Sequence, residues 1–257
     1  MKKSIEQPIT EKCHQRFRRL EFWRNPLLWV LILFSFLPSC SHVDTAEPRV
    51  VIIFVDLSLS SLPERENYKR YIEKVISKLA PGDRIAVGKI IDLTIADFVP
   101  IADVAIPAFN FWTDNRTLHK KMVDDITSQL FASIDSVLDS RGKIERSEII
   151  NAFLISEQFL RKKGGRKSLV VLSDMLECSS EYNFEREEVT NEYVEKSIQS
   201  LRDKDRIPRL DNVEVWVAGA FAKTTEKYFA VQTFWNRYIR ETGADCRSYS
   251  HALLDFD

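Results

Sequence analysis

Three oxygen-bearing side chains at alternate positions follow an apolar run in "VVIIFVDLSLSS", residues 50–61. The run up to Val55 is rich in β-branched residues, which is typical of a central strand covered on both faces. Asp56, Ser58 and Ser60 then occupy every second position. Such side chains can form and cap a turn, or they can offer a row of oxygen atoms to a ligand. The elements around them decide between these two interpretations.

Apolar runs and amphipathic segments alternate along the chain after residue 48. The pattern predicts strands at 49–58, 84–92, within 97–109, at 164–175, 212–221 and 248–256, and helices at 63–80, 117–138, 148–163, 191–201 and 226–244. This alternation predicts an α/β fold with a doubly wound, Rossmann-like, mostly parallel six-stranded sheet and helices on both faces. The third strand, flanked by Pro100 and Pro107, is expected to be an antiparallel edge strand.

Binding sites in such sheets lie at the carboxyl ends of central strands, near the point where strand order reverses. Asp56 ends the first predicted strand, and Asp174 ends the strand within "KSLVVLSDM". We therefore expect the two carboxylates at the same edge of the sheet.

Asp-x-Ser-x-Ser after a first strand resembles the metal-ion-dependent adhesion site of von Willebrand factor A domains. Three further segments resemble that family in order and spacing: "LAPGDRIAVGKI", "SEIINAFLISEQFL" and "KSLVVLSDM". The resemblance covers residues 49–257. It implies that Ser58, Ser60 and Ser147 bind a metal ion directly and that Asp56 and Asp174 act mainly through waters.

Mg²⁺ or Mn²⁺ is the ion that this resemblance implies. A hard divalent cation prefers about six oxygen ligands. Because hydroxyls are neutral, a site of three serines and two aspartates leaves the ion electron-poor. It can then accept a carboxylate, an exposed Asp or Glu, from a partner protein.

Two positions depart from the family pattern. Ser147 stands in place of a threonine, and Met175 stands where a glycine normally lets the backbone turn. Ser147 precedes an apolar helix and could also be its N-cap. Asp56, Asp174 and the serines could equally be turn formers in a site that holds no metal.

The N-terminal segment predicts export. Seven Lys and Arg residues against three Glu precede the apolar run "PLLWVLILF", as in a signal peptide. "LPSC" resembles the lipobox of bacterial lipoproteins, which implies lipidation of Cys40. We expect a signal peptide at 1–39, a linker at 40–48 and a periplasm-facing lipoprotein, with the outer membrane favoured over the inner. An uncleaved signal anchor and a cytosolic protein are the alternatives.

Composition narrows the function classes. The 257 residues are 44% hydrophobic, enough for a sizeable core. Residues 40–257 carry a net charge of −5, so the chain offers no basic surface for nucleic acid.

Cys178 and Cys246 could pair, although they are predicted at opposite edges of the sheet. No phosphate loop, nucleophile elbow or Cys/His metal pattern occurs, so we expect a binding protein and not an enzyme.

Other features have two interpretations each. "FNFWTDN", residues 109–115, could pack beneath a loop or form the rim of a partner-binding surface. Trp216 and Trp235 are expected in the core.

Taken together, these features of the sequence predict an envelope-anchored domain that binds a protein through a Mg²⁺ site. A metal-free scaffold module is the first alternative, and a metal-dependent hydrolase using Asp56 and Asp174 is the second.

Overall fold

The computed structural model describes residues 47–91, 95, 98–139, 144–161, 163–253 and 255–256. The chain divides into two units, Met1–Thr45 and Ala46–Asp257, and every described residue belongs to the second. The predicted signal peptide, Cys40 and most of the linker lie outside the described residues. Within the described ranges, no helix has the length and hydrophobicity needed to cross a bilayer.

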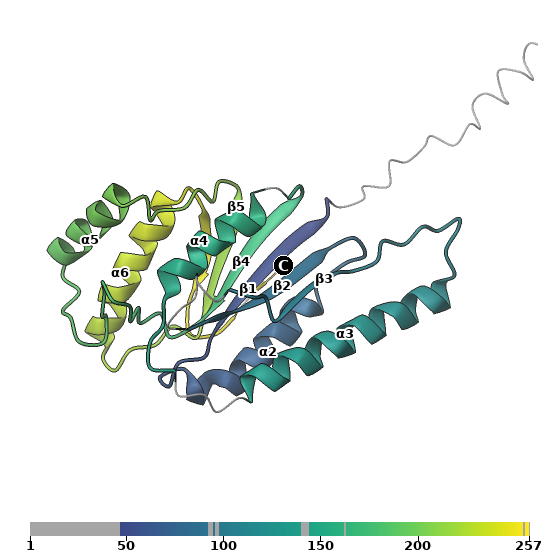
Figure 1. The fold of residues 1–257 in the computed structure, drawn as a ribbon, viewed down its shortest axis with the longest axis horizontal. Helices are drawn as coiled ribbons and strands as arrows, with labels where there is room; N and C mark the ends of the chain where they lie inside the picture. Colours follow the sequence, from purple (N-terminus) through teal and green to yellow (C-terminus); the bar gives the residue numbers. More distant parts are fainter. Residues whose placement is uncertain are drawn as a thin grey trace, which may run out of the picture. The chain divides into compact units, whose positions relative to one another are not determined.

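Six strands form one sheet in the order β3-β2-β1-β4-β5-β6 (Figure 1). The strands are β1 (Arg49–Asp56), β2 (Arg84–Ile90), β3 (Ala102–Ala105), β4 (Arg166–Leu172), β5 (Val213–Ala218) and β6 (Asp245–Tyr249). All neighbours are parallel except β2 and β3, which are antiparallel at the edge. Strand order reverses at β1, which pairs with both β2 and β4. The predicted fold class is confirmed.

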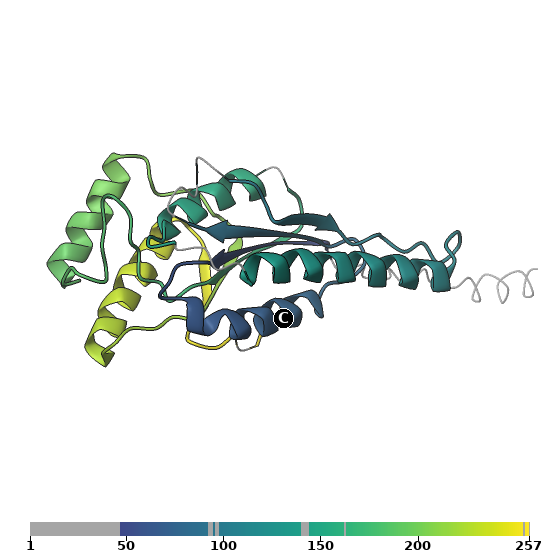
Figure 2. The same ribbon diagram turned by 60° about the horizontal axis from the view of Figure 1, so that its bottom comes forward.

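Helices cover both faces of the sheet (Figures 1 and 2). They are α2 (Arg65–Ile76), α3 (Arg116–Leu138), α4 (Ile149–Leu160), α5 (Asn191–Asp203) and α6 (Thr225–Glu241), and a short 3₁₀ turn, η1 (Leu62–Glu64), precedes α2. Alternate side chains of β1 enter opposite layers. Ile53 packs in the layer with α2 and α3, and Phe54 packs in the layer with α4, α5 and α6. Trp216 and Trp235 are buried, as predicted.

The last strand differs from its prediction. Residues 248–256 were expected to form it, but β6 covers Asp245–Tyr249 and contains Cys246. The segment "DCRSY" has no strongly apolar face, whereas the apolar residues that suggested a strand lie further on. Leu253 and Phe256 are buried in the core layer of α2 and α3 without being part of a strand. Cys178 and Cys246 are both free thiols.

Candidate functional site

Asp56 is the centre of a hydrogen-bonded cluster at the carboxyl end of β1. Its side chain is fully buried. The Oδ1 atom accepts from the Ser58 amide at 2.8 Å and from Ser147 Oγ at 3.0 Å. The Oδ2 atom accepts from Ser173 Oγ at 2.7 Å. One carboxylate thus joins the ends of β1 and β4 to the segment before α4.

Ser58 and Ser60 lie together in the loop that follows β1. Their hydroxyl oxygens are 3.0 Å apart, and Ser58 is buried while Ser60 is exposed. The loop is fixed on both sides because Leu57 N donates to Ile90 O and Leu59 N donates to Ile144 O. The backbone therefore holds the two hydroxyls at the edge of the sheet where Asp56 ends its strand.

Asp174 is the second carboxylate of this edge, directly after β4. Burial and the negative charge of Asp56 raise its pKa from 3.8 to about 7, while hydrogen bonds from the Ser60 side chain and the Leu176 amide act in the opposite direction. Glu185 adds a further negative charge. Among the described residues, the main influences on the Asp174 pKa include no cationic group. Two neighbouring carboxylates are therefore held in buried positions, and the negative charge of Asp56 disfavours the charged form of Asp174.

Ser147 belongs to this cluster and does not cap the following helix. Its backbone pairs with Cys178 in an isolated antiparallel bridge, with N···O distances of 3.2 and 3.0 Å. The cap of α4 comes instead from Glu177, whose Oε2 accepts from the amides of Ile149 at 2.7 Å and Ile150 at 3.0 Å. The interpretation of Ser147 as the N-cap is thus wrong, and its hydroxyl serves Asp56.

The sequence did not single out Ser173 and Glu177. Ser173 follows Leu172, which pairs with Val55, so the strand register places Ser173 beside Asp56. The sequence signal that could have identified Ser173 was a hydroxyl directly before Asp174. Glu177 is fully buried, and burial raises its pKa from 4.5 to about 8. It positions Ser147 indirectly, because it fixes the start of α4 two residues further on.

Met175 takes the backbone conformation that the glycine of the family pattern would allow. Its φ is +67°, in the left-handed region that disfavours L-residues. Its amide donates to Ser173 Oγ at 2.9 Å, and its carbonyl accepts from Trp235 Nε1 at 2.8 Å. The Met175 side chain is buried in the layer of α4 and α6. The turn is therefore kept, and buried packing offsets its strain.

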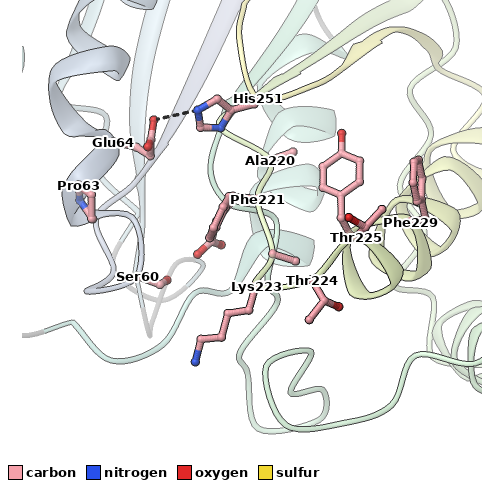
Figure 3. Close-up of a pocket in the computed structure, with 13 residues that line it drawn as sticks. Ser60, Pro63, Glu64, Ala220, Phe221, Lys223, Thr224, Thr225, Phe229 and His251 are labelled. Atoms are coloured by element: carbon pink, nitrogen blue, oxygen red, sulfur yellow. Dashed lines mark ion pairs between the residues drawn. The ribbon is translucent and has the colours of Figure 1, made fainter.

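A cleft of about 720 Å³ opens beside the cluster (Figure 3). Ser60 and Asp174 are among the residues that line it, together with Phe221, Phe229 and His251. Phe221 and Phe229 are 56% and 57% exposed. The Phe221 amide donates to the Asp174 carbonyl at 3.1 Å, so the loop after β5 is attached directly to the cluster.

The residues of the cluster fit a hard divalent cation. The structure brings all five predicted ligands to one edge, and every donor is an oxygen. Among the described residues, no group of three or more His, Cys, Asp or Glu side chains could hold a metal ion, so any ion here depends on the hydroxyls. Two buried, neighbouring carboxylates are an arrangement that a divalent ion would neutralise.

Comparison with known proteins gives likeness in fold only. No protein-family model and no curated protein matches the chain. A von Willebrand factor type A protein from Catenulispora acidiphila is 13% identical, with a TM-score of 0.35 over 77% of this chain and 43% of that one. An aerotolerance-related membrane protein from Bacteroides fragilis is 15% identical, with a TM-score of 0.37 over 79% of this chain and 92% of that one.

The pilus adhesin SpaC from Lactobacillus rhamnosus GG is 10% identical, with a TM-score of 0.36. The match covers 52% of this chain and only 15% of the adhesin. Likeness at this level gives no information about the function of this chain.

Proposed function

We propose that the chain is an envelope-anchored protein-binding domain of the von Willebrand factor A type. Asp56, Ser58, Ser60, Ser147 and Asp174 would hold Mg²⁺ or Mn²⁺, which would supply a Lewis-acidic position for a partner carboxylate. The observation that carries the proposal is the burial of Asp56 and Asp174 as neighbouring carboxylates in one hydroxyl-rich cluster.

The side chains of this chain would divide the work. Hydroxyls of Ser58, Ser60 and Ser147 would contact the ion without neutralising it, so that a partner Asp or Glu adds the missing negative charge. Asp56 holds Ser147 and Ser173 in place through its two carboxylate oxygens. The neighbouring cleft, with exposed Phe221 and Phe229, would receive the side chains that flank the partner's carboxylate.

A metal-free binding module is the second candidate, and one observation favours it. Asp56 already accepts hydrogen bonds from Ser58 N, Ser147 Oγ and Ser173 Oγ, so its carboxylate is well satisfied by the protein alone. In that case the cleft lined by Phe221 and Phe229 would carry the binding by itself. We propose binding and not catalysis in both cases.

The location is proposed from the N-terminal sequence. A lipidated Cys40 would attach the chain to the membrane, the outer membrane being favoured, with the domain facing the periplasm. The mass of the membrane-extracted protein tests this part. Acyl chains on an N-terminal Cys40 would support it, and an intact, unmodified N-terminus would contradict it.

Water-proton relaxation by bound Mn²⁺ tests the metal function in the full chain in detergent. We expect the wild type to enhance relaxation, because bound Mn²⁺ keeps exchangeable waters, and acetate to reduce the enhancement by displacing one of them. Asp56→Ala should show no enhancement, while Asp103→Asn, on the outermost strand β3 and outside the cluster, should behave as the wild type. Equal enhancement in Asp56→Ala would exclude this site.

A further inference from the structure

A pair of exposed aromatic residues lies at the end of the domain opposite the Asp56 cluster. Phe111 is 79% exposed and Trp112 is 89% exposed, and Leu118 in the first turns of α3 is 59% exposed. We call these three residues the aromatic tip. The expectation that this segment packs beneath a loop is wrong for Phe111 and Trp112. Large apolar side chains gathered in this way mark an interaction surface.

Local hydrogen bonds hold the aromatic tip in its exposed position. The Trp112 amide donates to Asn110 Oδ1 at 3.0 Å, and the Asn110 amide donates to Asp114 Oδ2 at 2.7 Å. Asn115 caps α3 by accepting from the amides of Thr117 and Leu118. The rings of Phe111 and Trp112 contact each other edge to face, with centroids 5.7 Å apart. The loop is thus built to present these rings.

Strand register places the aromatic tip at the amino edge of the sheet. Val50 at the start of β1 pairs with Arg84, and Arg84 pairs with Ala105 at the end of β3. The chain therefore leaves β3 toward the tip at the edge where β1 begins. The other end of α3 lies near the opposite edge, because Arg65 Nη1 donates to Leu138 O. Figures 1 and 2 show α3 continuing past the sheet at the amino edge.

The sequence before β1 indicates what lies at this edge. Eight residues lie between Cys40 and Arg49, and the nine residue-to-residue steps that join them span at most about 30 Å. A bilayer that held Cys40 would therefore be kept within this distance of the amino edge of the sheet. The Asp56 cluster lies at the other end of β1, which is eight residues long.

The charges around the aromatic tip suit an anionic lipid surface. Arg116, Lys120 and Lys121 are exposed in the first turns of α3, and Phe111, Asp114, Arg116 and Lys120 are among the residues that line one cavity of about 580 Å³. Asp114 is tied into the loop by hydrogen bonds, and Asp124 and Asp125 lie further along α3. Tryptophan and phenylalanine favour the interfacial layer of a bilayer, and basic residues favour anionic headgroups.

We propose that the aromatic tip inserts into the interfacial layer of the phospholipid bilayer to which the chain is attached. Docking at this edge turns the Asp56 cluster away from the membrane, toward an approaching partner. The inference rests on the membrane anchor of the proposed function and does not depend on the metal site.

Quenching by brominated lipids tests this in the full chain, reconstituted in vesicles of phosphatidylethanolamine and phosphatidylglycerol. The emission of Trp112 is obtained as the difference between the wild type and Trp112→Phe, which keeps an aromatic ring. We expect brominated acyl chains to reduce this emission about twofold, because interfacial side chains reach the boundary of the acyl region. Phe111→Ser combined with Leu118→Ser should abolish most of the quenching, while Leu62→Ser, 49% exposed in η1 at the opposite edge, should leave it unchanged.

Each other outcome overturns the docking. Vesicles that float with the chain while Trp112 stays unquenched would exclude it and leave the anchor intact. Trp112 emission that is blue-shifted, unquenched and dependent on protein concentration would show that a second copy covers the tip. A chain that does not float with the vesicles would contradict both the anchor and the docking.

Discussion

The hydroxyl of Ser147 donates to both carboxylate oxygens of Asp56, at 3.0 and 3.1 Å, across 91 positions of the chain. Because the hydroxyl donates its hydrogen to Asp56, the lone pairs of its oxygen remain available to a cation bound in this cluster. Ser147 thus has a structural role, the hydrogen bond to Asp56, and a proposed metal-binding role. Substitutions at this position test the two roles by different measurements.

Replacement of Ser147 tests this separation. Ser147→Ala should weaken Mg²⁺ binding by at least about tenfold and lower the free energy of unfolding of the metal-free chain by about 1–2 kcal/mol, because Asp56 loses a hydrogen bond. Ser147→Thr keeps the hydroxyl and restricts its rotamer, so it should bind Mg²⁺ at least as tightly as the wild type. Calorimetry and urea unfolding measure the two effects. Unchanged Mg²⁺ affinity in Ser147→Ala would remove this residue from the ligand set.

The backbone at Met175 gives a second prediction. Both Met175→Ala and Met175→Gly remove a buried side chain, which costs about 2–5 kcal/mol, but only glycine relieves the strain of a φ of +67°. The glycine variant should therefore be more stable than the alanine variant by about 1 kcal/mol, the reverse of the usual order. Urea unfolding of the two variants decides this. Alanine equal to or better than glycine would mean that the turn is not left-handed.

Glu177 should make stability depend on pH. Its pKa is raised from 4.5 to about 8 in the folded chain, so the folded state retains a proton that the unfolded state has lost. This contribution is fully present below pH 4.5 and is lost as pH rises to about 8. Glu177→Gln mimics the protonated form, and we expect it to reduce the decline in unfolding free energy across this range.

Glu181→Gln is the matched control for this pH profile. Lys204 and burial act in opposite directions on the Glu181 pKa, and the hydrogen bond from Lys204 prevails and lowers it below 4.5. Its titration therefore lies outside the range in question, and the profile of this variant should follow the wild type. A Glu177→Gln profile as steep as that of the wild type would show that Glu177 does not hold the extra proton.

Asp174 should oppose the stability of the metal-free fold. Burial and the charge of Asp56 raise its pKa to about 7, so at pH 8 the folded chain holds an unfavourable second charge. Asp174→Asn keeps an oxygen for the Leu176 amide and removes that charge. We expect urea unfolding at pH 8 without metal to show a gain of about 1 kcal/mol or more. A loss of stability would mean that the carboxylate is compensated by the protein itself.

The sequence predicted most of the fold because burial dictates it. Continuous apolar runs such as β1 occur where helices cover both faces, and helical periodicity located α2, α3 and α6 to within a few residues. The β6 prediction was wrong because "DCRSY" pairs through its backbone alone at an edge, whereas Leu253 and Phe256 are buried without forming a strand.

The site was predictable in part for a similar reason. The alternate spacing of Asp56, Ser58 and Ser60 is visible in the sequence, because all three follow the end of one strand. Ser173 and Glu177 act through contacts that depend on register and on an isolated bridge between Ser147 and Cys178. For Phe111 and Trp112 the sequence left burial and exposure open, because their exposure depends on how far α3 extends past the sheet.

Calorimetric titration of the full chain with MgCl₂ at pH 8 tests the central claim most directly. If the cluster is a metal site, the wild type binds one Mg²⁺ per chain, Asp174→Asn binds none despite its more stable fold, and Asp103→Asn, whose carboxylate pairs with Arg84, binds as the wild type does. Absence of saturable Mg²⁺ binding by the wild type, or equal binding by Asp174→Asn, would contradict the account.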